Sequence, residues 1–209
     1  MKERPILFTP ENAQKVHDGV KVQTRRIVKP QPLHISWFEH QRGWCARVRE
    51  DTGSAAHPAY VMMPCPYGQV GDRLWIKHHT WKPTTLGDIR NDQRWNPVSR
   101  EIIWRIGPVV SDVAGVSETS WKKVNGLFMP RWACRTVVEL TEIRVERVND
   151  ISPSDALAEG IFCPEIGYAQ HGERAPVLLY GCLWNSINGK DSWAQNPWVW
   201  VLTFRKVEP

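Results

Sequence analysis

Basic and aromatic side chains gather in two short segments of the sequence, and together they are suited to binding a nucleobase or RNA. The first segment contains Arg25 and Arg26, and the second contains Arg73, Trp75 and Lys77. Guanidinium and ammonium groups bind phosphates, and a Trp ring stacks on a base. We therefore expect these residues to line a cationic groove. The alternative is a solvated strand edge whose basic side chains oppose aggregation.

The charge distribution favours an anionic partner in the same part of the chain. The 209 residues carry a formal net charge of +5. Residues 1–150 contain 23 basic and 16 acidic side chains, whereas residues 151–209 contain 4 and 6. A basic amino-terminal portion is typical of proteins that bind nucleic acid. The mildly basic surface of an ordinary soluble protein explains the same numbers.

The segment Gly-Val-Lys-Val-Gln-Thr-Arg-Arg at 19–26 fits the pattern GxKxxxxR. Further pieces follow it in a fixed order: PYGQVGDRLWIK (66–77), MPRWACR (129–135), ISPSDALAEGI (151–161), LWNSINGKDSW (183–193) and NPWVWVLTF (196–204). Together they resemble the ASCH family, and in particular its longer, often phage- or prophage-encoded members. The matching pieces cover about half of the chain and leave 27–65 and 83–128 as insertions.

The resemblance implies a PUA-like β-barrel and an activity. One branch of the family consists of amidohydrolases that remove the acetyl group from N4-acetylcytidine with a lysine, a threonine and a glutamate. The matching residues of this sequence are Lys21, Thr24 and Glu159. His78 stands where the family ordinarily has a glutamate. We expect His78 to border the substrate, and its replacement of the glutamate would either abolish the activity or change the specificity.

The chemistry that the resemblance implies is physically coherent. A threonine hydroxyl becomes a useful nucleophile only when a neighbouring base takes its proton. A lysine is such a base only when neutral, and at its ordinary pKa only about one in two thousand is neutral at pH 7. Burial, together with the positive charges of Arg25 and Arg26, would lower the pKa of Lys21. Glu159 would carry the proton to the leaving amine or orient Lys21.

One geometric condition follows for the segment that holds Lys21 and Thr24. Residues three apart point to opposite faces of a regular strand, so these two side chains meet only if the backbone over 19–24 is irregular. The ordinary structural explanation treats Lys21 as a solvated side chain and Thr24 as a strand former. It treats Glu159 as an exposed residue in the last turn of a helix, where the helix dipole disfavours a carboxylate.

The sequence predicts neither a metal site nor a cofactor. His78 and His79 are adjacent, so a strand would direct them to opposite faces, and no complementary set of ligands is present. The five cysteines form no CxxC pair. No GxGxxG, P-loop or GxSxG pattern appears, which argues against nucleotide-driven chemistry and against a serine-esterase elbow.

Local patterns predict the elements that must position these residues. Thr9 is expected to cap a helix that Gly19 ends, with Ala13, Val16 and Val20 on its apolar face. A change of parity from Val138 and Leu140 to Ile143 and Val145 would place a bulge in a long strand. The other expected elements are strands at 5–9, 71–81, 101–106 and 197–207 and helices at 152–160, with Ser152 as its cap, and at 176–189.

The whole chain is expected to be a single ASCH, PUA-like α+β domain over 1–209, a partly open β-barrel with short helices and two irregular insertions. No apolar run is long enough to span a membrane, the first residues do not form a signal peptide, and the odd number of cysteines indicates free thiols in the cytoplasm. The predicted function is deacylation of a nucleoside or RNA of the N4-acetylcytidine type. The alternatives are a non-catalytic RNA-binding module and a phage accessory protein that binds a host factor. The oligomeric state is left open.

Overall fold

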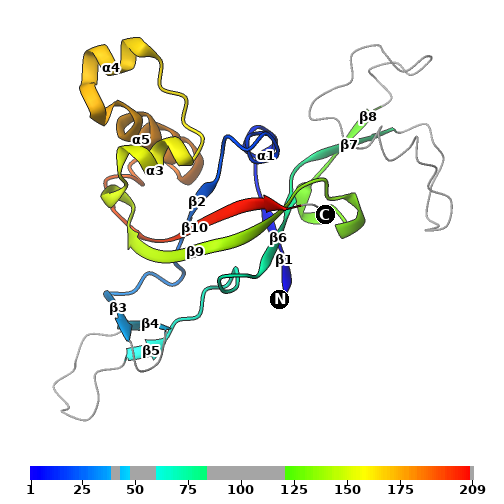
Figure 1. Ribbon diagram of the computed structural model, residues 1–209, viewed down its shortest axis with the longest axis horizontal. Coiled ribbons are helices and arrows are strands. Elements are labelled where there is room, and N and C mark those ends of the chain that lie inside the picture. Colours follow the sequence, from blue (N-terminus) through cyan, green and yellow to red (C-terminus); the bar gives the residue numbers. More distant parts are fainter. Residues whose placement is uncertain (39–42, 48–59, 84–120, 208–209) are drawn as a thin grey trace.

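The computed structural model describes residues 1–38, 43–47, 60–83 and 121–207. Their arrangement is α+β, with a five-stranded sheet at the centre in the order β1-β6-β9-β10-β2 (Figure 1). Its strands are β1 (Glu3–Leu7), β2 (Gln23–Ile27), β6 (Arg73–Lys77), β9 (Val137–Arg147) and β10 (Trp198–Val207). β1 runs parallel to β6, and the other neighbours are antiparallel. The mixed α+β class predicted from the sequence is confirmed.

Helices cover the sheet on both faces of β10. They are α1 (Pro10–His17) on one face and α3 (Pro153–Ala158) and α5 (Ala175–Asn188) on the other, whereas α4 (Glu165–His171) contacts α5. Short 3-10 turns lie at Gly126–Phe128, Arg131–Ala133, Val148–Asp150 and Gly172–Arg174. Val199 and Val201 pack against α3 and α5, whereas Trp200 and Leu202 face the core that α1 completes. Because side chains alternate along a strand, burial of all four residues requires cover on both sides of the sheet.

The predicted bulge is present in β9. The pairing of β9 with β10 shifts by one residue between Thr203 and Phe204, which leaves Thr141 as the extra residue. A shift of one residue reverses which face every following side chain takes. The bulge therefore brings the apolar residues on both sides of it to the same core cluster: Val138, Leu140, Ile143 and Val145.

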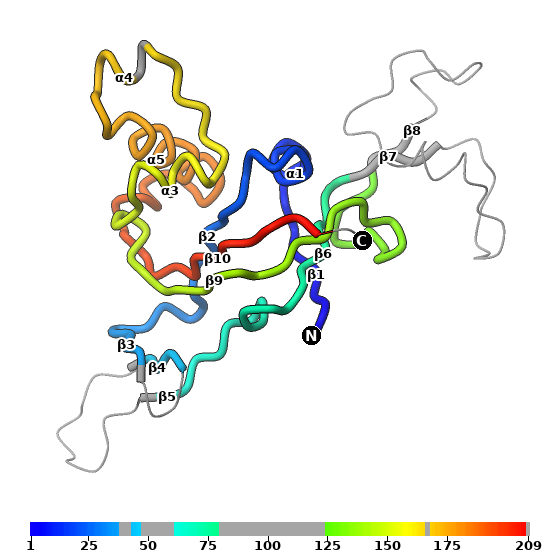
Figure 2. The backbone as a smooth tube through the Cα atoms, viewed as in Figure 1, coloured from blue at the N-terminus to red at the C-terminus, as the bar shows by residue number. Residues whose placement is uncertain are grey.

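Two helices begin at the caps that the sequence predicts. The Thr9 hydroxyl accepts from the Asn12 amide at 3.3 Å at the start of α1. The Ser152 hydroxyl accepts from the Asp155 amide at 3.1 Å at the start of α3. A side-chain oxygen at this position satisfies one of the amides that the first helical turn leaves unpaired. α5 also lies where it is expected, whereas α4, through which the chain passes between α3 and α5 in Figure 2, was not predicted.

The expected apolar face of α1 is correct for Ala13 and Val16 but wrong for Val20. The first two are buried, and Val20 is 58% exposed. The helix ends at His17, and Gly19 has a φ of +75°, a left-handed conformation that glycine adopts without strain. The chain leaves the helix axis at this turn, so Val20 no longer continues the helical spacing.

The first insertion is more regular than the sequence predicts. Residues within 27–65 form an antiparallel sheet of β3 (His34–Phe38), β4 (Gly43–Arg47) and β5 (Tyr60–Met62). Trp37 and Trp44 pair directly across β3 and β4 with their ring centroids 5.3 Å apart. Such an aromatic pair stabilises neighbouring strands without the alternating pattern that sequence inspection relies on.

A two-stranded sheet of β7 (Thr80–Pro83) and β8 (Trp121–Val124) brackets most of the second insertion, 83–128. This pair and the β3-β4-β5 sheet project from opposite ends of the central sheet in Figure 1. The strand expected at 101–106 lies outside the described residues.

The edge strands of the central sheet, β1 and β2, approach each other at one point. Arg26 Nη2 on β2 donates to the carbonyl of Leu7 on β1 at 2.6 Å. A partly open barrel requires such an approach of the two sheet edges, and closure into a barrel stays a prediction. Among the described helices, none combines the length and the apolar character needed to cross a bilayer.

Leu74→Ala tests the core. Leu74 is fully buried in the cluster that β6, β9, β10 and α1 share, so its truncation is expected to lower the free energy of unfolding by about 2–5 kcal/mol. The matched control is Leu178→Ala on α5, where the side chain is half exposed and the expected change is under about 0.5 kcal/mol. Urea denaturation followed by Trp fluorescence measures both. Equal losses for the two variants would contradict this core.

Candidate functional site

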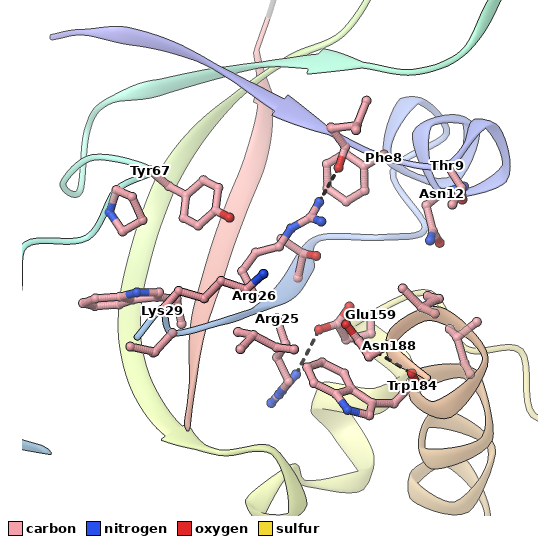
Figure 3. A pocket seen from close by; sticks show the side chains of 18 of the residues that line it. Phe8, Thr9, Asn12, Arg25, Arg26, Lys29, Tyr67, Glu159, Trp184 and Asn188 are labelled. Atoms are coloured by element: carbon pink, nitrogen blue, oxygen red, sulfur yellow. Dashed lines mark hydrogen bonds and ion pairs between the residues drawn. The ribbon is translucent and has the colours of Figure 1, made fainter. Parts of the chain in front are cut away.

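A cavity of about 740 Å³ lies between β2, the end of α3, α5 and the loop at 63–67. Its volume falls in the range of small-molecule sites. Side chains from several elements that are distant in the sequence line it: Phe8, Thr9 and Asn12 near the start of α1, Lys21, Thr24, Arg25, Arg26 and Lys29 around β2, Tyr67 in the loop, Glu159 after α3, and Tyr180, Trp184 and Asn188 on α5. Figure 3 shows most of these residues pointing into one space.

Lys21 enters the cavity from an irregular segment that joins α1 to β2. The amides of Val20 and Lys21 both donate to the Lys15 carbonyl, at 2.9 and 3.0 Å, and the Val22 amide donates to the Ala158 carbonyl at 2.9 Å. The predicted irregular backbone is therefore present over 19–22, and the strand begins only at Gln23. Lys21 and Thr24 consequently line the same cavity, and each is 4% exposed.

Glu159 is buried against Lys21 rather than exposed at the end of a helix. It caps the C-terminus of α3, and Gly160 then turns the chain with a φ of +82°. Lys21 Nζ donates to the Glu159 carbonyl at 2.9 Å and also forms an ion pair with its carboxylate. The ammonium thus offsets both the negative end of the helix dipole and the carboxylate charge. The ordinary structural explanation for these two residues is wrong.

Arg25 holds the opposite oxygen of the Glu159 carboxylate. Its Nη1 donates to Glu159 Oε1 at 3.3 Å, as Figure 3 marks. The same guanidinium donates to Glu146 Oε1 at 2.7 and 2.9 Å and to Asp155 Oδ2 at 3.1 Å, and its side chain is fully buried. Because the protein already engages these donors, Arg25 fixes Glu159 rather than offering an empty binding group to a ligand.

Tyr180 is a member of the site that sequence reasoning missed. Its hydroxyl lies 3.4 Å from Glu159 Oε1, and its ring packs against Trp184 and Trp193 with centroids 6.1 and 6.0 Å apart. Tyr180 and Trp184 are four residues apart on α5 and therefore share one helix face. That spacing was the available signal, but it is equally typical of a core-facing helix.

Burial decides the electrostatics of the site. Loss of water contact lowers the pKa of Lys21, and the nearby Glu159 charge opposes the shift without cancelling it. Burial likewise raises the pKa of the Tyr180 hydroxyl well above its ordinary value, and the negative charge of Glu159 adds to the rise. The environment therefore makes the Lys21 ammonium easier to deprotonate than that of an exposed lysine, as a base requires, and makes the Tyr180 hydroxyl harder to deprotonate.

Arg26 occupies the wall of the cavity above Phe8. Its guanidinium carbon lies 4.8 Å from the centre of the Phe8 ring, and Nη2 is bound to the Leu7 carbonyl. The Nε is buried and has no hydrogen-bond partner among the described residues. Burial lowers the pKa of this guanidinium.

The second predicted group does not reach the cavity. Arg73, Trp75 and Lys77 alternate along β6 with Leu74 and Ile76, which take the core-facing side. The first three side chains therefore point to the other face, where Trp75 packs on a separate small cluster and Lys77 Nζ donates to the Leu127 carbonyl at 2.6 Å. The cationic groove expected from the sequence is thus divided between two surfaces.

His78 is buried but is not among the residues that line the cavity. Its Nδ1 lies 2.8 Å from the His79 carbonyl, and burial lowers the pKa of its imidazole. The neighbouring His79 lines the cavity instead. Within the part of the chain that the structure covers, no group of three or more His, Cys, Asp or Glu side chains is arranged to hold a metal ion.

Comparison with known proteins gives one weak likeness. No family model matches the chain, and neither does any curated protein. Among solved structures, the chain is similar to the ASCH domain from Lactobacillus crispatus JV V101, with a TM-score of 0.37 and 11% sequence identity over 100% of this chain and 81% of that chain. No feature of the site rests on this likeness, and the family resemblance of the sequence motifs stays a prediction.

The buried amine gives a testable pH dependence. The pKa of Lys21 is lower in the folded protein than in the unfolded chain, where it is near 10.4, so the unfolded state binds more protons between these two values. Stability from this group therefore rises with pH in that window. We expect the free energy of unfolding of the wild type, relative to Lys21→Met, to increase as the pH rises from neutral toward the unfolded-state pKa.

Urea denaturation across the pH series measures this difference. The matched control is Lys190→Met, which removes an exposed lysine beyond α5. A difference in the free energy of unfolding between wild type and Lys21→Met that stays flat or falls with rising pH would show that burial does not lower the pKa of Lys21.

Proposed function

We propose that this protein is an ASCH-type, PUA-like amidohydrolase that deacylates an N4-acetylcytidine-type nucleoside, with Lys21, Thr24 and Glu159 as its catalytic residues. The observation that carries the proposal is the buried contact between Lys21 and Glu159, which are 138 residues apart, in the wall of a cavity that Thr24 also lines. Stability alone does not require this contact, because apolar side chains of similar volume fill such a space without the cost of burying two charges.

The walls of the cavity suit a flat heterocycle. Tyr67, Tyr180, Trp184 and Trp200 supply aromatic rings from a loop, α5 and β10. A base stacked against such a ring gains roughly 1–3 kcal/mol and is held in a fixed plane. The amide on N4 of a cytosine bound in this way would face Lys21, Thr24 and Glu159, which line the same cavity.

In the first step the acyl group passes to Thr24, while Lys21 accepts one proton and Glu159 donates one. In the reactive state the shared proton lies on Glu159, which leaves Lys21 neutral. Thr24 Oγ forms a bond to the acyl carbon while its proton passes to Lys21. The bond between the acyl carbon and N4 breaks, and Glu159 gives its proton to N4. The products of this step are the free cytosine amine, the acyl-threonine, and the charged Lys21–Glu159 pair.

Hydrolysis of the acyl-threonine returns the site to its starting state. Water attacks the ester carbon and gives its proton to the Glu159 carboxylate. The bond to Thr24 Oγ breaks, and Lys21 returns a proton to this oxygen. Acetic acid leaves, and the neutral amine and the carboxylic acid are restored. Arg25 serves as a positioning residue, because it fixes the orientation of Glu159 through both steps.

Non-catalytic binding of RNA or a nucleoside is the second candidate function. The observation that favours it is the ion pair itself: an ammonium bonded to both the carbonyl and the carboxylate of Glu159 is a stable resting arrangement without any reaction. Binding of cytidine without any hydrolysis of the acylated nucleoside would be the result expected of this alternative.

Deacetylation of N4-acetylcytidine tests the proposed activity. Wild-type protein is expected to release cytidine, measured by chromatography. Thr24→Val, Lys21→Met and Glu159→Gln are each expected to lower kcat/KM by about 100-fold or more, because proton transfer by a positioned group contributes on the order of 10²–10⁴.

The control for this experiment is Lys190→Ala, an exposed substitution away from the cavity, which is expected to retain wild-type rates. Circular dichroism of each variant separates loss of chemistry from loss of fold. A wild-type protein that releases no more cytidine than buffer does, or a Thr24→Val variant with full activity, would refute the assignment.

A further inference from the structure

The basic side chains of the cavity fall into two groups that differ in whether the protein already neutralises them. Lys21 is paired with Glu159, and Arg25 is paired with Glu146, Asp155 and Glu159. Arg26 and Lys29 line the same cavity, yet neither forms an ion pair with any carboxylate of the described residues. Two positive charges therefore line the cavity without a carboxylate of the described residues in ion-pair contact.

The Arg26 guanidinium is held in place, but not all of its N–H donors have hydrogen-bond partners. The hydrogen bond to the Leu7 carbonyl and the packing over Phe8 fix the direction of its guanidinium. Its Nε is buried without a partner among the described residues. A buried donor that makes no hydrogen bond carries a cost of about 1–3 kcal/mol, so such groups call for an explanation. The terminal Nη1 of the same guanidinium also has no partner among the described residues but is not buried, so an acceptor on a bound ligand can reach it.

Lys29 and Tyr67 border the same space. Figure 3 shows the Lys29 side chain reaching into the cavity and the Tyr67 hydroxyl pointing toward the Arg26 side chain. The Tyr67 hydroxyl makes no hydrogen bond within the described part of the chain. The charge of Arg26 is close enough to lower the pKa of Tyr67, although burial raises it by more. A guanidinium, an ammonium and a phenol thus present donors to one region.

We propose that Arg26, Lys29 and Tyr67 form a subsite for a phosphate group, so that the ligand of the cavity is a phosphorylated nucleoside, either a mononucleotide or a residue of RNA. The inference rests on the proposed function for the position of the base. Glu159 and Trp184 lie on the α5 side of the cavity, whereas Lys29 and Tyr67 lie on the opposite side with Arg26 between them (Figure 3).

The chemistry of these donors favours phosphate over a neutral group. A guanidinium carries several N–H donors in a fixed plane and binds phosphate oxygens with good geometry, and an ammonium adds a point charge. The volume of about 740 Å³ leaves room beside a pyrimidine ring for the sugar and a phosphate. A base against the aromatic side chains of α5 would project its ribose phosphate toward β2.

Binding of non-acylated ligands tests this subsite without requiring turnover. Calorimetric titration of wild-type protein compares cytidine, cytidine 5′-monophosphate, cytidine 3′-monophosphate and a short oligocytidylate. At least one phosphorylated ligand is expected to bind about 10-fold tighter than cytidine or more, since a hydrogen bond to a charged group contributes roughly 1.5–3 kcal/mol. Inorganic phosphate is expected to compete with that ligand.

Variants of Arg26, Lys29 and Tyr67 test whether these residues cause the tighter binding of the phosphorylated ligand. Arg26→Gln and Lys29→Ala are each expected to reduce the advantage of the phosphorylated ligand about 10-fold while leaving cytidine binding within about threefold. Lys29→Ala is the variant least able to disturb folding, because Lys29 is exposed. Tyr67→Phe removes only a hydroxyl and is expected to reduce the same advantage by roughly 2- to 10-fold, as the loss of a neutral hydrogen bond does. Lys190→Ala, away from the cavity, is the matched control.

The outcomes separate this inference from the proposed activity. A mononucleotide that binds as tightly as the oligocytidylate would identify a free nucleotide as the ligand, and tighter binding of the oligocytidylate would identify RNA. Phosphorylated ligands that bind no better than cytidine, including no binding of either, would overturn the subsite. So would an advantage that persists in both Arg26→Gln and Lys29→Ala. None of these results depends on hydrolysis, so failure of the deacetylation assay leaves the test valid.

Discussion

The buried contact between Lys21 and Glu159 is the interaction on which the interpretation of this fold depends. Removing two opposite charges from water costs several kcal/mol for each, and their mutual attraction offsets this cost only when further hydrogen bonds complete the geometry. The structure supplies those bonds through the Glu159 carbonyl, Arg25 and Tyr180. Exclusion of water in this way lowers the pKa of the lysine. Such a shift is unusual for a surface lysine and useful in a reacting site.

The fold creates this contact by bringing together two turns. One turn ends α1 and carries Lys21 into β2, and the other ends α3 and carries Glu159 away from it. The Val22 amide joins them through the Ala158 carbonyl, and Lys15 Nζ donates to the Gly160 carbonyl at 2.8 Å. The sheet and α5 then close the space around the pair, so packing that stabilises the core also excludes water from the site.

Local patterns in the sequence were sufficient for α1, α3 and α5 and for β1, β6, β9 and β10, because caps, glycine turns and alternation act within a few residues. Thr9 and Ser152 cap helices as predicted. The partners of Arg25 could not be found in this way, because Glu146 and Asp155 lie more than a hundred residues further along the chain. Nor could inspection show that the basic residues of β6 face away from the cavity. Their direction follows from the burial of Leu74 and Ile76 in the core on the other side of the strand.

A double-mutant cycle on Lys21 and Glu159 tests the central contact most directly. The free energy of unfolding is measured for wild type, Lys21→Met, Glu159→Gln and the double variant at neutral pH. Each single change leaves one buried charge without the opposite charge of this pair, and the second change removes that remaining charge. We expect the losses to be non-additive, with a coupling of about 1 kcal/mol or more. Losses that add to within about 0.5 kcal/mol would mean that the two side chains do not interact in solution.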